Sequence, residues 1–267
     1  MNSEIAKLVP ENVYGSSKRL AWIASRLSPK DSILEVGCGT GFMICLPLLK
    51  LGYSIQGLDI DAQSIEYGRT IFKENNVDPN RLHVMDLKDT KGKFDAIIAS
   101  EVLEHLETAE INQVLKMIHD KLNPGGKLFV TVPNGFGWFE MDTFLWNKLG
   151  FKFIIEKTGL LEVIYQIKKL FLKKKTAWSP HPSTLSNSPH LQRFSLNGII
   201  NLLKQNHFSV EEATGSVLLS GPLVNTFFHE VGPFIKANCA LGETFPRRSS
   251  SFFIACKASQ NAGSHDS

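Results

Sequence analysis

The stretch of sequence that most limits the fold is ILEVGCGTGF at residues 33–42, where a short apolar run leads directly into a turn with three glycines. Such a run ending in glycine is typical of a buried strand in a parallel sheet. Gly37, Gly39 and Gly41 lack a Cβ, so the backbone here can approach a ligand closely. In open α/β sheets, ligands bind beyond the carboxyl ends of the strands. The stretch therefore predicts an α/β sheet with a ligand beside this turn.

Strand and helix patterns continue to alternate through the first half of the chain. Further strands are expected at 54–60, 81–87, 94–100 and 127–133. Between them, helices are expected at 40–50, from Asp61 to about Asn75, and at 109–121, the last of these ending at the breaker NPGG (123–126). This alternation predicts right-handed βαβ crossovers and a doubly wound parallel sheet. Later in the chain, the patterns predict a helix at 195–206, a strand at 208–214, a loop-rich segment and a last strand at 249–258.

The length of 267 residues suits one large α/β domain that carries an insertion. We divide it into five segments, which are an N-terminal helical segment (1–29), a cofactor-binding core (30–134), a substrate-lid insertion (135–193), the C-terminal part of the core (194–258) and a disordered tail (259–267).

The spacing of the glycines separates two kinds of cofactor. The dinucleotide fingerprint GxGxxG would need a glycine where this chain has Phe42. The pattern here is ExGxGxG, which begins at Glu35. With it, the sequence resembles the class I S-adenosylmethionine (SAM)-dependent methyltransferases, and in particular the O-methyltransferases of ubiquinone biosynthesis. The resemblance covers residues 30–134 closely and the rest loosely.

Three further marks carry this resemblance in the family's order. Asp59 ends the second strand in GLDID, where a carboxylate can accept hydrogen bonds from both ribose hydroxyls. Asp86 ends the third strand, at the place where the family's acid meets the adenine amino group and the next backbone N–H, here that of Leu87, meets a ring nitrogen. FDAIIASEVLEHL and LNPGGKLFVTVPN match the family's fourth and fifth strands.

The resemblance implies a Rossmann-like sheet of seven strands, mostly parallel with the last strand antiparallel, and SAM as the cofactor. It implies a cofactor site made of Glu35, Gly37, Cys38, Gly39, Gly41, Asp59, Ile60, Asp86, Leu87 and Glu101.

A second group of candidate residues is EVLEH, just past the fourth strand. On a helical turn, Glu101, Glu104 and His105 share one face. Similar ExxEH turns in the ubiquinone-biosynthesis enzymes and in small-RNA 2′-O-methyltransferases bind a divalent metal, although related turns elsewhere hold none. Whether a metal binds here is left open. His105 is a candidate catalytic base, and so is His190 in SPHLQRFSL, because related enzymes often place an active-site histidine there.

The insertion is where acceptor choice is expected to lie. The aromatic stretch 134–146 is expected to line the acceptor pocket, with Trp138 and Phe139 as its walls. Residues 145–175 carry eight Lys against two Glu, and Leu160, Val163, Ile164, Ile167 and Phe171 fall at helical spacing, with Lys168 and Lys169 off that stripe. A basic amphipathic helix of this kind, near 157–175, can be a plain lid, cover an anionic substrate, or contact an anionic membrane.

Composition bears on the partners and the cellular location of the protein. The net charge of +3 does not indicate nucleic acid as a partner. The four cysteines form no CxxC pair, the N-terminal residues do not resemble a signal peptide, and no apolar run is long enough to span a membrane, which together predict a cytoplasmic protein. The predicted activity is SAM-dependent O-methylation of a small-molecule acceptor or one linked to a lipid or sugar. Transfer to nitrogen or carbon, and a non-catalytic SAM-binding protein, remain open alternatives.

Overall fold

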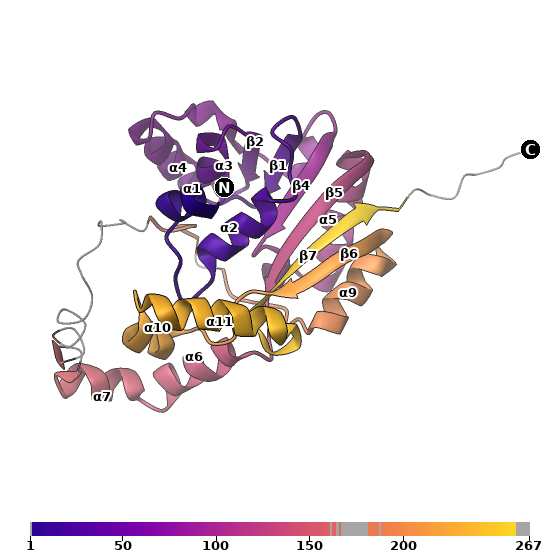
Figure 1. The fold of residues 1–267 in the computed structure, drawn as a ribbon. Coiled ribbons are helices and arrows are strands. Elements are labelled where there is room, and N and C mark those ends of the chain that lie inside the picture. Colours follow the sequence, from indigo (N-terminus) through magenta and orange to yellow (C-terminus); the bar gives the residue numbers. More distant parts are fainter. Residues whose placement is uncertain (1, 161, 164–165, 167–180, 187, 260–267) are drawn as a thin grey trace, which may run out of the picture.

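The computed structural model describes the chain except for residues 1, 161, 164–165, 167–180, 187 and 260–267. Seven strands form one sheet in the order β3-β2-β1-β4-β5-β7-β6 (Figure 1). The strands are β1 (Ser32–Val36), β2 (Ser54–Asp59), β3 (Leu82–Val84), β4 (Phe94–Ser100), β5 (Leu122–Pro133), β6 (Phe208–Gly215) and β7 (Ser251–Ala258).

Neighbours among β1 to β5 pair in parallel, and β7 runs antiparallel between β5 and β6. The predicted fold class is therefore confirmed, including the antiparallel last strand.

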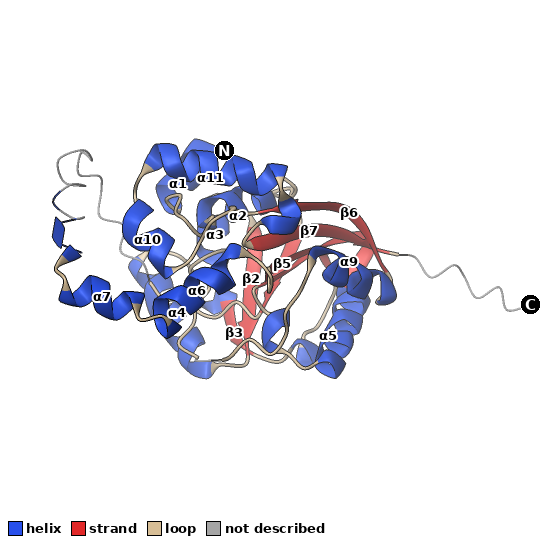
Figure 2. Ribbon diagram, turned by 90° about the horizontal axis from the view of Figure 1, so that it is seen from below, coloured by secondary structure: helices blue, strands red, loops and turns tan. Residues whose placement is uncertain are grey.

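Helices cover both faces of the sheet, as Figures 1 and 2 show. One face packs against α1 (Asn2–Leu8), α2 (Ser16–Ala24), α3 (Cys45–Lys50) and α4 (Ala62–Glu74). The other face packs against α5 (Thr108–Lys121) and α9 (Leu196–Gln205). Each face has its own apolar core, because strands buried on both sides need a helical layer above and below.

The ends of several elements follow from local chemistry. Asp61 begins α4 as expected, since its carboxylate accepts a hydrogen bond from the backbone N–H of Gln63 at 3.2 Å. The predicted helix at 40–50 is shorter than expected, because the turn continues to Ile44 and α3 begins only at Cys45. The motif NPGG does not separate α5 from a later strand. Strand β5 already begins at Leu122 and runs through the motif, with a register irregularity opposite Phe94 and Ala96.

The segment predicted to be rich in loops, between β6 and β7, contains two helices. These are α10 (Pro222–Phe228) and α11 (Gly232–Thr244), and each has proline in its first turn. Proline is suited to that position because the N–H it lacks has no partner within the helix. The expectation of a loop-rich segment between these strands was therefore wrong.

The start of the insertion forms two helices, α6 (Trp138–Lys148) and α7 (Phe151–Lys157). Helix α6 packs against both α7 and α10. Asp142 of α6 is fully buried and accepts hydrogen bonds from the backbone N–H groups of Leu223 and Val224 at 2.8 and 2.9 Å, so it caps the first turn of α10. The predicted apolar stripe lies only partly in the structure. Leu160 and Val163 are described, whereas Ile164, Ile167, Phe171, Lys168 and Lys169 lie outside the described residues.

Candidate active site

The glycine turn has the backbone conformation that its sequence requires. Gly37, Gly39 and Gly41 have φ angles of 65°, 55° and 67°, a region that other residues rarely adopt. A Cβ on Gly37 would lie 2.6 Å from Val102 Cγ2. The turn is held against β2, because Gly39 N–H donates to Asp59 Oδ2 at 2.7 Å. Two of the predicted cofactor residues are thus brought into direct contact.

Glu35 lies beneath this turn as the only acid of β1. Its side chain is buried, and its Oε2 accepts a hydrogen bond from the backbone N–H of Cys45 at 3.1 Å, which ties the strand to the start of α3. Burial raises the pKa of Glu35 to about 7, although the hydrogen bond from Cys45 lowers it in part.

The acids expected to face the nucleoside lie at the ends of β2 and β3. Asp59 Oδ1 accepts a second hydrogen bond, from Asp61 N–H at 2.8 Å, so backbone donors fix the orientation of its carboxylate. Ile60, beside it, is 79% exposed. Asp86 accepts a hydrogen bond from Lys88 N–H, which lowers the pKa of Asp86, and Leu87 is buried next to it. Cys38 is buried within the glycine turn.

Glu101 is held in an uncommon backbone conformation at the end of β4, with a φ of 57°. Its N–H donates to Thr131 O at 2.8 Å, and Thr131 Oγ1 donates to Glu101 Oε1 at 3.0 Å. Arg19 of α2 pairs with the same oxygen at 3.3 Å. The N-terminal helical layer therefore supplies a cation to the predicted cofactor site, which the sequence analysis missed because nothing near Arg19 in the sequence marks it.

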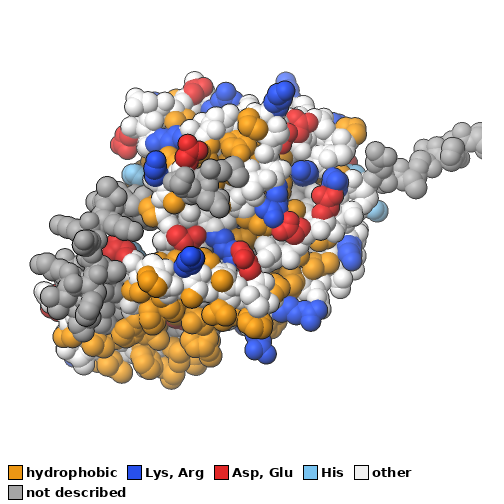
Figure 3. All heavy atoms as spheres, viewed as in Figure 1, with side chains coloured by type: hydrophobic (Ala, Val, Ile, Leu, Met, Phe, Trp, Pro, Cys, Tyr) orange, Lys and Arg blue, Asp and Glu red, His pale blue; other side chains and the backbone are white. Residues whose placement is uncertain are grey.

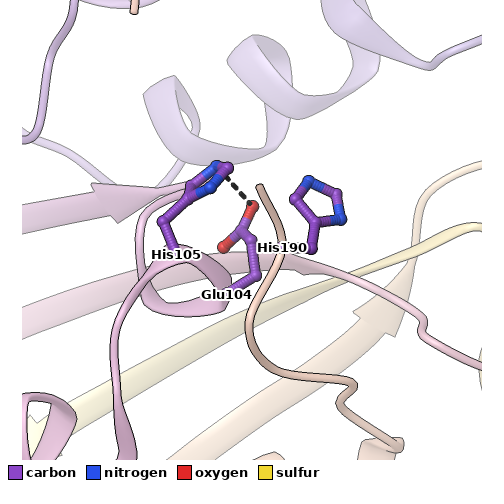
Figure 4. Close-up of side chains that lie close together, drawn as sticks. All are labelled: Glu104, His105 and His190. Carbon is purple, nitrogen blue, oxygen red and sulfur yellow. Dashed lines mark ion pairs between the residues drawn. The ribbon is translucent and has the colours of Figure 1, made fainter. Parts of the chain in front are cut away.

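The ExxEH residues do not all share one face as expected. Leu103–His105 form a single 3₁₀ turn, and the left-handed conformation of Glu101 directs it toward Arg19 and Thr131 instead. Glu104 and His105 are joined by His190, and ligand atoms from these three side chains lie within 4.8 Å of one another (Figure 4).

His190 is brought to this cluster by the backbone of the 3₁₀ turn. Glu104 O accepts hydrogen bonds from Leu191 N–H and Gln192 N–H at 2.7 and 3.0 Å. The two imidazole rings are 5.0 Å apart between centroids. His105 Nδ1 lies 3.1 Å from Pro189 O, so Nδ1 donates to that carbonyl and the lone pair of Nε2 is left available.

Glu104 is the most unusual group of the cluster. Its side chain is 1% exposed, and neither carboxyl oxygen has a hydrogen-bond partner among the described residues. Burial, with a smaller contribution from the charge of Glu101, raises the pKa of Glu104 well above its ordinary range. A buried carboxyl without donors is stabilised by a proton or by a cation. One carboxylate and two imidazoles are ligands that divalent metals accept, so the donor set fits a metal ion.

A short segment, residues 181–186, lies over the glycine turn, and we call it the strap. Thr40 N–H donates to Ser183 O at 2.9 Å, and Thr40 Oγ1 donates to Pro182 O at the same distance. A Cβ on Gly39 would overlap Ser183 O. The strap also contacts α4. Leu185 N–H of the strap donates to Ser64 Oγ of α4 at 2.8 Å, and Tyr67 OH of α4 lies 3.1 Å from His181 Nδ1 of the strap. No local sequence pattern indicates this contact.

Trp138 does not stand as a free pocket wall. It packs against a small apolar cluster of Val13, Val224 and Ile235, while Phe139 is half-buried. The predicted lining of an acceptor pocket by 134–146 stays a prediction.

Comparisons with known proteins agree with this arrangement. The family model described as Methyltransferase domain matches residues 11–213. The chain is 38% identical over 104 residues to a ubiquinone biosynthesis O-methyltransferase of Chelativorans sp. (strain BNC1), which covers 38% of this chain and 40% of that protein. It is 36% identical over 108 residues to the mitochondrial ubiquinone biosynthesis O-methyltransferase of Rattus norvegicus, a match that covers 38% of this chain and 30% of that protein. The match thus spans less than half the length of either relative.

A solved structure shares the fold over most of the chain. The magnesium protoporphyrin IX methyltransferase of Synechocystis PCC 6803, solved with bound SAH, superposes with a TM-score of 0.52 at 17% identity, covering 91% of this chain and 81% of that one. The glycine turn, the two strand-end acids and the seven-stranded sheet therefore have one explanation: the chain belongs to the methyltransferase-domain family and has the fold of the SAM-dependent methyltransferases.

Proposed function

We propose that the chain transfers a methyl group from SAM to a hydroxyl oxygen of a small-molecule, lipid-linked or sugar-linked acceptor. The cluster of Glu104, His105 and His190 is the observation that favours oxygen as the atom that accepts the methyl group. A hydroxyl must lose its proton as it attacks, and a base near the methyl group provides for this. The relatives named for O-methylation in ubiquinone biosynthesis support the same choice.

The glycine turn and Asp59 would hold the cofactor, and Glu35 keeps the turn in place from below. Because the sulfonium already activates the methyl group, the protein's main task is to position the acceptor oxygen in line with it. In the absence of a metal, His105 Nε2 or His190 would take the hydroxyl proton, since the Nδ1 of His105 is engaged by Pro189 O.

We further propose that in the active protein Glu104, His105 and His190 hold a divalent cation. The cation would then supply a Lewis acid for the acceptor hydroxyl in place of a histidine base, because an imidazole nitrogen that ligates a metal cannot also accept a proton. The carboxyl oxygens of the buried Glu104 have no hydrogen-bond partner among the described residues, and Oε1 lies 4.0 Å from His105 Nε2, which supports this assignment (Figure 4). We also propose a cytoplasmic location, with which the four free cysteines agree. Contact of the lysine-rich stretch 157–175 with an anionic membrane stays a proposal, since most of that stretch lies outside the described residues.

The test combines methyl transfer with metal binding. Purified protein is incubated with labelled SAM and a panel of hydroxylated acceptors, and transfer to at least one of them is expected. Chelation should abolish transfer, and added Mg²⁺ or Mn²⁺ should restore it. Mn²⁺ binding, followed by electron paramagnetic resonance, should be lost in Glu104→Gln and kept in Glu74→Gln, which removes one exposed charge from α4.

Each result that contradicts the proposal has a separate meaning. SAM binding without transfer to any acceptor would favour the non-catalytic alternative. Transfer only to amines or carbon acids would replace oxygen as the target atom. Full activity after chelation, with no Mn²⁺ bound by the unmodified protein, would leave the two histidines as bases and exclude the cation.

A further inference from the structure

We propose that an apolar surface on α6, α7 and α10, which we call the apolar face, docks the protein onto an anionic lipid surface. Figure 3 shows hydrophobic side chains gathered at the lower left of the molecule, where Figure 1 places these helices. The exposed apolar residues of the face are Met141, Phe144, Leu149, Phe151, Phe153, Ile154, Phe227 and Phe228.

The face is exposed to an unusual degree. Phe153 is 59% exposed, Phe144 55% and Ile154 51%. Single exposed apolar residues are normal on a protein surface, but contiguous patches mark sites of contact with another molecule or a membrane. Five of the eight residues are phenylalanines, which lose little conformational entropy on burial and remove much apolar area from water.

The helices that carry the face are fixed to one another. Asp142 of α6 caps α10, and Phe228 of α10 stacks on Phe234 of α11 at 4.0 Å between ring centroids. Ile155 of α7 is 2% exposed, so α7 buries one side while Phe153 and Ile154 point to solvent. The exposure therefore belongs to packed helices.

Charge identifies the occupant. Lys148, Lys152 and Lys157 are exposed on α6 and α7, and within the described part of the chain no ion pair engages them. The same helices carry three acids: Asp142 is buried against α10, Glu140 is paired with Arg193 at 3.7 Å, and Glu156 is the third. The exposed and unpaired charges described on these helices are therefore the lysines. Lys157 Nζ lies 4.5 Å from the ring centroid of Phe153, so a lysine ammonium group and an aromatic ring are in contact on this surface. In a two-fold dimer this face would meet a copy with the same positive charge, whereas an anionic lipid surface complements it.

The described helices give no sign of integral insertion, because none of them is long and apolar enough to cross a bilayer. Docking would therefore be peripheral, with aromatic side chains in the headgroup region and lysines at the phosphates. Helix α6 begins five residues after β5 ends, so the docked face adjoins the carboxyl edge of the sheet where the candidate active site lies. That a docked enzyme receives a lipid-linked acceptor rests on the proposed function; the docking itself does not.

The test uses the full chain and sedimentation with vesicles, either of phosphatidylcholine alone or with about a third phosphatidylglycerol. The unmodified protein should bind the anionic vesicles. Phe153→Gln combined with Ile154→Gln should lower the partition coefficient by roughly tenfold or more for each side chain withdrawn. Replacing Lys148, Lys152 and Lys157 with Gln should lower it about fivefold for each lysine on anionic vesicles only.

The matched control is Val84→Gln, an apolar residue 45% exposed on the edge strand β3, which should leave vesicle binding unchanged. Retained SAM binding shows that each variant is folded. The proposal is overturned if the unmodified protein stays in the supernatant, or if the α7 double variant binds vesicles as the unmodified protein does. It is also overturned if sedimentation equilibrium finds a dimer that the double variant dissociates, because a second copy would then occupy the face. Vesicle binding needs no turnover, so its failure is separate from a failure of methyl transfer.

Discussion

At the scale of single residues, Glu35 shows how the cofactor turn is built at a cost in stability. Its carboxyl is buried and receives one backbone donor, and its pKa is raised to about 7. The folded state therefore keeps a proton that the unfolded chain releases above its ordinary pKa near 4.5. Because the folded state binds more protons in this window, the free energy of unfolding falls as pH rises from about 4.5 to about 7, and the loss is complete above 7.

Glu35→Gln should remove this dependence. The amide oxygen can still accept the hydrogen bond from Cys45 N–H, while the side chain no longer titrates. Urea unfolding at pH 5, 6, 7 and 8 should show a decline in unfolding free energy that is smaller in the variant by up to about 3 kcal/mol. Glu74→Gln, at an exposed position, serves as the control and should follow the unmodified protein. Parallel curves for Glu35→Gln and the unmodified protein would refute this account of the turn.

A local sequence pattern can mark residues that belong to one turn or strand end, whereas contacts made across the fold cannot be predicted from such a pattern. The glycine turn and Asp59 follow from local pattern, and a hydrogen bond connects them. His190 was proposed as a base on its own, but its pairing with His105 depends on the backbone of Glu104, 86 residues earlier in the chain. Arg19 reaches Glu101 only because α2 packs over the sheet. Such pairings depend on tertiary packing, which no local pattern encodes.

At the scale of elements, the strap is the connection that most affects the cofactor site. It bonds to Thr40 in the glycine turn and to Ser64 and Tyr67 of α4. Since Ser183 O lies directly over Gly39, a cofactor that reaches this turn must do so while the strap is displaced. We therefore expect the strap contacts to limit entry of the cofactor.

Tyr67→Phe should loosen the strap without removing an aromatic ring. Loss of one hydrogen bond costs about 0.5–1.5 kcal/mol, so association of SAM should be roughly two- to tenfold faster, whereas dissociation, which begins with the strap already displaced, should change little. Stopped-flow fluorescence measures both rates. Tyr53→Phe removes a comparable hydrogen bond, from the hydroxyl to Ala24 O, away from the strap, and should leave the rates unchanged. Equal rates in Tyr67→Phe and the unmodified protein would show that the strap does not limit exchange.

The elements also show where sequence patterns mislead. Helix α4 and strands β1, β2 and β4 were predicted closely, because a cap or an apolar run of the right length marks each. The helices α10 and α11 were missed, because proline in a first turn and proline in a loop look alike until packing is known. Strand β5 includes NPGG because its neighbour β4 continues to pair with it at Phe94.

At the scale of the whole molecule, the cofactor joins parts that the chain keeps far apart. The glycine turn, the ends of β2 and β3, Arg19 of α2 and the strap all surround one edge of the sheet. A ligand bound there stabilises only the folded state, so it raises the free energy of unfolding by about 2.7 kcal/mol at a hundred times its Kd.

SAM at that excess should raise the Tm of the unmodified protein by roughly 5–10 °C, as measured by differential scanning fluorimetry. Asp59→Ala should lose most of this shift at the same SAM concentration, because removing a charged acceptor weakens binding by about 1.5–3 kcal/mol. NAD at equal concentration is the control ligand and should give no shift. A larger shift with NAD than with SAM would contradict the cofactor assignment.

The position of β7 has a consequence for how the chain is made. Strand β6 pairs only with β7 in the described sheet, and β7 separates it from β5. During translation, β1 to β5 can assemble as soon as residue 133 has left the ribosome. Strand β6 then waits with both edges open until residues 251–258 emerge and insert beside it. The last strand to be made, β7, thus completes the sheet by inserting between β5 and β6. A ribosome that stalls before β7 emerges would leave the edges of β5 and β6 unpaired and open to chaperones.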